Sequence, residues 1–181
     1  MFAYVRGFSK LSDRNLLWYF NVLHPVLAAV INKHRNEIEH LETWGDAIHL
    51  ITAKASTAAQ VAMEINDALA TIDQSSLGLT KPLLLRIGLH YGPTYKLYDH
   101  FAQKYTYSSS DVIKAARIEP VTPPGEIFGT EPFVAMLEIE DAHWAAPVYA
   151  GTISSAKNFG AFRMFHIRPK YRDSVLMCSL A

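Results

Sequence analysis

A carboxylate beside a glycine is the first feature of the sequence with a chemical use. Asp46 follows Gly45, and apolar, β-prone residues flank the pair over 38–41 and 48–51. A Gly-Asp pair between two such runs is typical of a β-hairpin tip. There Asp46 is either a turn former, the usual role of aspartate beside glycine, or a rigid ligand for a hard cation, Mg²⁺ or Mn²⁺. The spacing alone favours the turn former.

Three histidines are further candidates for metal binding. His40 and His49 are expected to be cross-strand neighbours on the hairpin, and His90 ends a later apolar run. Zinc sites combine three or four ligands at recognisable spacings. No third ligand at such a spacing accompanies these histidines, so the sequence favours structural roles for them.

The elements that must position these residues follow from hydrophobic periodicity. We expect helices over 12–32, kinked at Pro25, over 56–72 on one apolar face, from Ser110 or Asp111 to 118, and over 131–137. We expect strands over 2–5, 83–90, 105–108, 126–128, 148–153 and 161–167, with a hairpin over 37–52. The order βαββαβ, followed by further αβ material, predicts an α/β (α+β) ferredoxin-like core with a mainly antiparallel sheet.

Composition limits the class of protein. The chain has 181 residues, half of them hydrophobic, which fits one folded domain over 1–181 with an unassigned tail over 169–181. Seventeen basic residues balance seventeen acidic ones, so no nucleic-acid or membrane partner is expected. The single cysteine, Cys178, excludes an internal disulfide, and no apolar run has transmembrane length. We expect a cytoplasmic protein.

An aromatic-rich segment lies between the strand expected over 83–90 and the helix expected from Ser110 or Asp111; its aromatic residues are Tyr95, Tyr98, Phe101, Tyr105 and Tyr107. Its stretch 95–103 is predicted to be a loop, with Asp99 as a loop charge and Asp111 as a helix cap. With a neutral chain, the aromatic side chains favour a packed loop or a dimer-interface arm over a base-stacking surface.

Four stretches, in this order and spacing, resemble the class III nucleotidyl cyclases over nearly the whole chain. They are FAYVRGFSKL from Phe2, ETWGDA from Glu42, LRIGLHYGP from Leu85, and the segment from Ser109 through AARIE at 115–119 to PGEI at 124–127. The resemblance implies a cyclase fold and a homodimer whose antiparallel subunits share each site. It also implies two Mg²⁺ or Mn²⁺ ions that hold a nucleoside triphosphate while the ribose 3′-hydroxyl attacks the α-phosphate and expels pyrophosphate.

The catalytic positions of the family carry over unevenly. The second metal aspartate matches Asp46, with a backbone carbonyl near Val5 beside it, and the transition-state arginine matches Arg117. The first metal aspartate falls at Tyr4, and a phenol is a poor ligand for a hard ion. The ribose-positioning asparagine falls at Ile113, which offers no hydrogen bond.

The substrate-binding positions carry over in the same residue-by-residue way. The triphosphate lysine falls near Phe159, with Lys157 two residues away. The phosphate turn, Gly7-Phe8-Ser9, opens toward a helix N-terminus. The purine-selecting position falls at Glu42, a guanine-type choice, and its partner position falls at Thr106. A solvated strand residue is an equal alternative for Glu42.

Two functions follow. The first is an enzyme that makes a 3′,5′-cyclic nucleotide and pyrophosphate, and the chain looks like a free-standing cyclase domain of the kind also found among antiviral pyrimidine cyclases. The second is a catalytically weak or dead pseudo-cyclase that binds a nucleotide or a protein partner, because Tyr4 and Ile113 stand at two catalytic positions.

Overall fold

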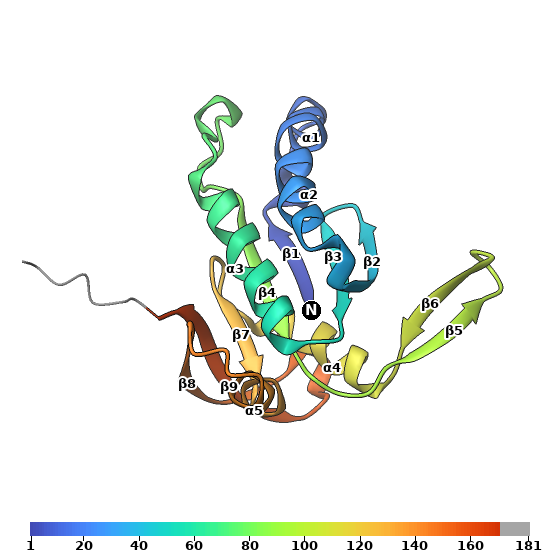
Figure 1. Cartoon of the computed structure of the whole chain (residues 1–181). Helices are drawn as coiled ribbons and strands as arrows, with labels where there is room; N and C mark the ends of the chain where they lie inside the picture. Colours follow the sequence, from blue (N-terminus) through green and yellow to red (C-terminus); the bar gives the residue numbers. More distant parts are fainter. Residues whose placement is uncertain (171–181) are drawn as a thin grey trace, which may run out of the picture.

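A seven-stranded sheet forms the centre of the molecule. The computed structural model describes residues 1–170 (Figure 1). The tail over 171–181, with Cys178, lies outside the described residues. Strands from both ends of the described range enter this sheet.

The strand order is β2-β3-β1-β4-β7-β9-β8, and the pairing is antiparallel except between β4 and β7. The strands are β1 (Phe2–Arg6), β2 (Ile38–Trp44), β3 (Ala47–Thr52), β4 (Leu84–Leu89), β7 (Ile127–Thr130), β8 (Ala145–Ser154) and β9 (Ala161–Pro169). The first four strands give the βαββαβ core, so the predicted fold class is confirmed.

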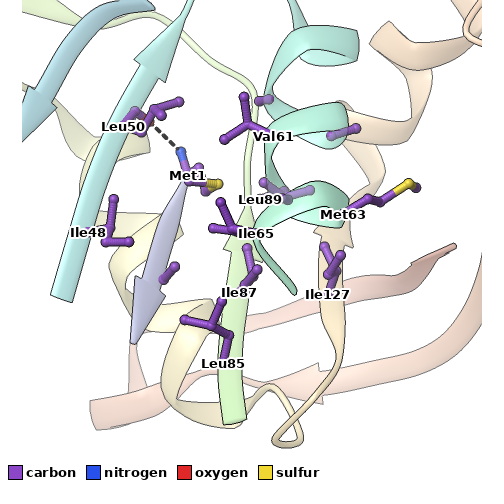
Figure 2. Packing of buried hydrophobic residues seen from close by; sticks show 14 of the residues in the cluster. Met1, Ile48, Leu50, Val61, Met63, Ile65, Leu85, Ile87, Leu89 and Ile127 are labelled. Carbon is purple, nitrogen blue, oxygen red and sulfur yellow. Dashed lines mark hydrogen bonds between the residues drawn. The ribbon is translucent and has the colours of Figure 1, made fainter. Parts of the chain in front are cut away.

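One face of this sheet is covered by helices. They are α1 (Asp13–Trp18), a π-helical turn over Tyr19–Leu23, α2 (His24–Lys33), α3 (Ala55–Thr71) and α5 (Glu131–Ile139). Alternate residues of β1, β3 and β4 point at these helices and are almost fully buried. Figure 2 shows this core, with Leu85, Ile87 and Leu89 of β4 packed against Val61 and Ile65 of α3.

The opposite face is covered by α4 (Ser110–Ile118) and a smaller cluster of Ile118, Phe128 and Met164. Gly88 allows the close approach of α4, because a Cβ there would lie 2.8 Å from the backbone nitrogen of Glu119. This face carries the polar side chains of β1 and β4, so α4 is placed beside them.

The predicted loop over 95–103 is wrong. Tyr95–Asp99 (β5) pairs with Lys104–Ser108 (β6) in a separate two-stranded hairpin. The hairpin projects from the body of the molecule as an arm (Figure 1). Lys104–Ser108 alternates polar and aromatic residues, but Tyr95–Asp99 does not, so the strand at 95–99 depends on its pairing with β6.

Helix starts depart from the predictions at two places. Ser12 caps α1 as expected, but Ser109, and not Ser110 or Asp111, caps α4. The second helix begins at Ala55, and the carboxylate of Glu140 accepts bonds from the N–H groups of Ala55 (2.9 Å) and Ser56 (2.7 Å). A distant side chain therefore does the capping that local sequence was expected to do.

None of the helices within residues 1–170 combines the length and the apolar character that crossing a membrane requires.

We expect Glu140→Gln to lower the free energy of unfolding by about 1–2 kcal/mol, because an amide cannot accept both bonds at the start of α3. Burial disfavours the carboxylate, but the bonds from Ser56 and Ala55 outweigh it and hold the pKa of Glu140 below its ordinary value of 4.5. The contribution is therefore fully present above pH 4.5 and is lost as the pH falls through the lowered folded-state pKa.

Urea denaturation of both proteins at neutral and acidic pH measures this difference. Glu138→Gln, an exposed neighbour on α5, is the matched control and should stay within about 0.5 kcal/mol of the parent. Equal stability of Glu140→Gln and Glu138→Gln at neutral pH would contradict the capping role.

Candidate active site

The pairing of β1 sets out the polar face of the sheet. Tyr4 lies opposite Ala47 of β3 on one side and opposite Arg86 of β4 on the other. Side chains of directly opposed residues lie on the same face of a sheet. Tyr4 and Arg86 therefore share the face that α4 covers, and the Arg86 guanidinium carbon lies 5.2 Å from the Tyr4 ring centre.

Asp46 lies in the turn between β2 and β3, where Gly45 adopts a left-handed φ of 65°. Val5 N–H donates to the backbone carbonyl of Asp46 (3.2 Å), which ties the turn to the central strand. The Asp46 side chain is buried, and burial raises its pKa. Burial, and then the charge of Asp46, also raises the pKa of Tyr4, so the phenol stays neutral beside the carboxylate.

The residues around Asp46 fit one hard cation. Its Oδ2 is buried and has no hydrogen-bond partner among the described residues. The N–H and C=O of a strand residue point to the same edge, so the Val5 carbonyl faces this turn with its N–H. Carboxylate and carbonyl oxygens are ligands that Mg²⁺ and Mn²⁺ accept. Tyr4 adds a neutral phenol where a second carboxylate would be needed to hold a second ion.

Arg86 and Glu119 also belong to this site, and neither was predicted as a site residue from the sequence. Nε of Arg86 lies 2.9 Å from Oε1 of Glu119, an ion pair without hydrogen-bond alignment. Burial raises the pKa of Glu119, while Arg86 opposes the rise. A charged residue inside the apolar run of β4 is the signal that could have identified Arg86.

The predicted phosphate turn opens a cationic groove. Gly7 has a left-handed φ of 101° and precedes a short 3₁₀ turn at Phe8–Lys10, whose first N–H groups have no partner within that turn. A groove of about 600 Å³ runs past Tyr4, Gly7 and Ser9. The charged residues in its lining are Arg6, Lys10 and Lys81. Three cations beside exposed backbone N–H groups suit a polyphosphate.

Ile113 and Arg117 lie four residues apart on α4 and share one side of it. Ile113 is exposed, while Nε of Arg117 is buried without a hydrogen-bond partner in residues 1–170. Arg86 is the cation that acts on the Asp46 carboxylate within the described chain. Asp46 Oδ2 and Arg117 Nε both lack a hydrogen-bond partner within residues 1–170, so these two atoms do not bond to each other inside one subunit.

Lys157 lies in the turn between β8 and β9, beside α4. Lys157 and the next residue, Asn158, both adopt left-handed φ values, 58° and 55°. Such strain in non-glycine residues is common at functional sites. The Lys157 side chain is exposed, as is Phe159 two residues on.

The predicted base pocket holds a pairing that the sequence did not indicate. Glu42 lies opposite His49, and Lys104 of the arm forms an ion pair with Oε1 of Glu42. Lys104, two residues before the predicted partner Thr106, is the arm residue that meets Glu42. His40 also lies close to Glu42, so the structure places beside His40 and His49 a third ligand-type side chain that the sequence spacing did not indicate.

A second cavity, of about 280 Å³, lies between the start of α4 and the end of β4. His90 lines this cavity, and both of its ring nitrogens have hydrogen-bond partners: Nδ1 lies 2.7 Å from Thr130 Oγ1, and Nε2 lies 3.0 Å from Asp111 Oδ1. Besides the candidate histidines His49 and His90, the predicted site residues lie outside its lining. Asp111, in the first turn of α4, therefore holds His90 and Lys114, and Ser109 takes the capping role that was expected of Asp111.

Solved structures share this fold. The adenylyl cyclase CyaB from P. aeruginosa matches with a TM-score of 0.76 and 19% identity, over 95% of this chain and 93% of that one. The guanylate cyclase domain of RhGC from Catenaria anguillulae, solved in complex with GTP, matches with a TM-score of 0.73 and 18% identity, over 94% of each chain. At these identities the likeness establishes the fold alone.

Sequence comparison gives one curated relative and a family. A protein of Acanthamoeba polyphaga mimivirus, named as a serine/threonine-protein kinase/receptor, is 37% identical over 71 residues. Those residues are 39% of this chain and only 4% of that protein. The family model of the adenylate and guanylate cyclase catalytic domain matches residues 1–150. The chain therefore belongs to the adenylate and guanylate cyclase catalytic domain family.

Proposed function

We propose that the chain binds a nucleoside triphosphate with one divalent cation and converts it slowly to a 3′,5′-cyclic nucleotide and pyrophosphate. The observation that carries this proposal is the buried Asp46 Oδ2, which lacks a partner among the described residues, close to a groove with three cationic side chains. A divalent ion and a polyphosphate would satisfy the two together.

The residues divide the work as follows. Arg6, Lys10 and Lys81, with the N–H groups of the Gly7–Ser9 turn, bind the triphosphate. Asp46 and the Val5 carbonyl hold Mg²⁺ or Mn²⁺, which when bound supplies the positive charge that makes the ribose 3′-hydroxyl more acidic.

The bond changes are those of an intramolecular phosphoryl transfer. The 3′ oxygen forms a bond to the α-phosphorus, and the bond from that phosphorus to the β-phosphate oxygen breaks. The hydroxyl proton goes to solvent, and pyrophosphate leaves. Arg117 and Lys157 of a second copy stabilise the negative charge that develops on the phosphates.

A homodimer follows from where these groups lie. Asp46 Oδ2 and Arg117 Nε both lack a hydrogen-bond partner among the described residues of one subunit, and a shared site would bring the two side chains together across an interface. The β5–β6 arm exposes large apolar side chains on a two-stranded hairpin, and such hairpins are barely stable alone. Those side chains are Tyr95, Leu97, Tyr98, Phe101 and Tyr105. A second copy is the surface that would cover them.

Turnover should be slow, and two residues favour a second candidate. Tyr4 removes one metal carboxylate, and Ile113 leaves the ribose without a hydrogen bond. A pseudo-cyclase that binds the nucleotide without turning it over is therefore the alternative. Glu42 would select guanine if it faces the base, whereas a pyrimidine substrate would leave it unused. Because the chain has a single cysteine, we expect it to work in the reducing environment of the cytoplasm.

Incubation with each of the four common ribonucleoside triphosphates and Mn²⁺, with the products read by mass spectrometry, tests the two candidates. A cyclic product supports the enzyme and names the base. Saturable binding without any product supports the pseudo-cyclase.

We expect Asp46→Asn to weaken Mn²⁺-dependent triphosphate binding at least about tenfold, because the amide cannot supply the charge of the carboxylate. Calorimetric titration with and without Mn²⁺ measures the loss. Asp67→Asn, an exposed aspartate on α3, is the control and should bind like the parent. If Asp46→Asn keeps the parent's metal-dependent affinity, Asp46 is only a turn residue.

We expect Tyr4→Asp to raise the initial rate of metal-dependent cyclisation about tenfold or more, because a second carboxylate beside Asp46 can hold a second ion. Adding Ile113→Asn should raise the rate further by orienting the ribose. Tyr4→Asn is the matched control: its side chain has nearly the shape of aspartate but no charge, so it should not raise the rate. A folded Tyr4→Asp protein with equal or lower activity would mean that Tyr4 serves a site of another design.

We expect light scattering at micromolar concentration to give the mass of a dimer, with an arm variant, Tyr105→Asp, shifted toward monomer by the charge it places in the interface. Ile139→Asp, at an exposed position of α5 outside the arm, is the matched control and should leave the mass unchanged. A strictly monomeric parent, with and without nucleotide and Mn²⁺, would contradict the shared site.

A further inference from the structure

Three ligand-type side chains meet on the polar face of the β2–β3 hairpin, away from Asp46. His40 and Glu42 alternate along β2, and His49 lies opposite Glu42 on β3. One ligand atom from each of the three lies within 4.8 Å of the others. Within residues 1–170 these are the His, Cys, Asp or Glu side chains that form such a group.

The group is mostly shielded from solvent, and one of its nitrogens lacks a partner among the described residues. The side chains of His40 and Glu42 are 10% and 15% exposed, and His49 is 3% exposed as a residue. Nε2 of His40 is buried without a hydrogen bond among the described residues. It lies 3.7 Å from Oε2 of Glu42, which is too far for a hydrogen bond. A buried polar atom without a partner is costly, and a bound ion would satisfy it.

Lys104 prepares Glu42 for a ligand role. The lysine ammonium pairs with Oε1 of Glu42, so Oε2 is left to face His40. A hydrogen bond from a neighbour to the non-ligating oxygen is the usual way that proteins orient a metal-binding carboxylate. Lys104 also balances the charge of Glu42 when the site is empty.

The two histidines are neutral at physiological pH and held by aromatic rings. Burial lowers the pKa of His49 to about 3 and also lowers the pKa of His40. A neutral imidazole is the form that binds a metal. The Phe2 ring stacks on His49 at 4.4 Å, and the Tyr107 ring lies 5.3 Å from His40. These contacts limit rotation of the imidazoles.

We propose that His40, Glu42 and His49 form a site for a borderline transition-metal ion, Zn²⁺ by its ligand set, distinct from the hard-ion site at Asp46. Two imidazoles and one carboxylate, with a fourth position open to water, are a known ligand set for zinc. At bond lengths of about 2.0–2.1 Å, tetrahedral ligand atoms lie about 3.3 Å apart, so the side chains need to move only a little. On the proposed function, an ion here would also withdraw Glu42 from the base.

The test uses the full chain in an Asp46→Asn background, which removes the hard-ion site. After treatment with a chelator and its removal, we titrate Zn²⁺ against a chromophoric chelator and record the visible spectrum with Co²⁺. We expect one Zn²⁺ per chain, a Co²⁺ spectrum of the intense tetrahedral type, and a thermal midpoint that rises with Zn²⁺ concentration.

His40→Gln is the deciding variant, because its lost nitrogen has no other described partner and folding should be retained. We expect it to weaken Zn²⁺ binding at least about tenfold and to abolish the tetrahedral Co²⁺ spectrum. His143→Gln, at an exposed turn after α5, is the matched control and should bind like the parent. Glu42→Gln should lose affinity in the same way, by removal of a charged ligand.

Unchanged Zn²⁺ affinity in folded His40→Gln, or a parent that binds no Zn²⁺ at micromolar concentration, would overturn the site. These outcomes are read without nucleotide or turnover, so they do not depend on whether the chain is an active cyclase.

Discussion

The hydrogen bond from Val5 N–H to the Asp46 carbonyl is the contact on which the candidate site depends. It fixes the tip of the β2–β3 hairpin against the central strand. The Asp46 carboxylate is thereby held in a buried position that it would not keep on a mobile turn. Because burial raises its pKa and leaves Oδ2 unpartnered in the described chain, the turn is poised for a cation.

The two faces of the sheet divide stability from chemistry. Toward α3, β1 and β4 present only apolar side chains, and these build the main core. Toward α4, the same strands present Tyr4, Arg86 and Gly88. Gly88 admits the backbone near Glu119, and Glu119 then pairs with Arg86. The packing of α4 therefore also sets the charge balance beside Asp46.

The hairpin offers two carboxylates in different surroundings. Asp46 lies among oxygen atoms, which suit Mg²⁺ or Mn²⁺, whereas Glu42 lies between two imidazoles, which suit zinc. They are four positions apart along the chain. Asp46 lies in the turn after β2, whereas Glu42 lies within the strand. The hairpin would therefore hold two ions of different chemistry at two separate sites.

The sequence by itself determined the core elements and the order of the motifs, because local periodicity, glycine turns and short motifs specify these without distant contacts. It placed β1, the hairpin, α3 and β4, and it identified Asp46 and the Gly7 turn as candidates. Only the tertiary structure decided that Glu140 caps α3 and that 95–99 is a strand. Likewise it brought Arg86 to Glu119, and Glu42 to Lys104 of the arm. The physical reason is that these contacts join residues on elements that are far apart in the sequence. Hydrophobic periodicity describes each element by itself, so it does not tell which side chains of different elements meet in the folded protein.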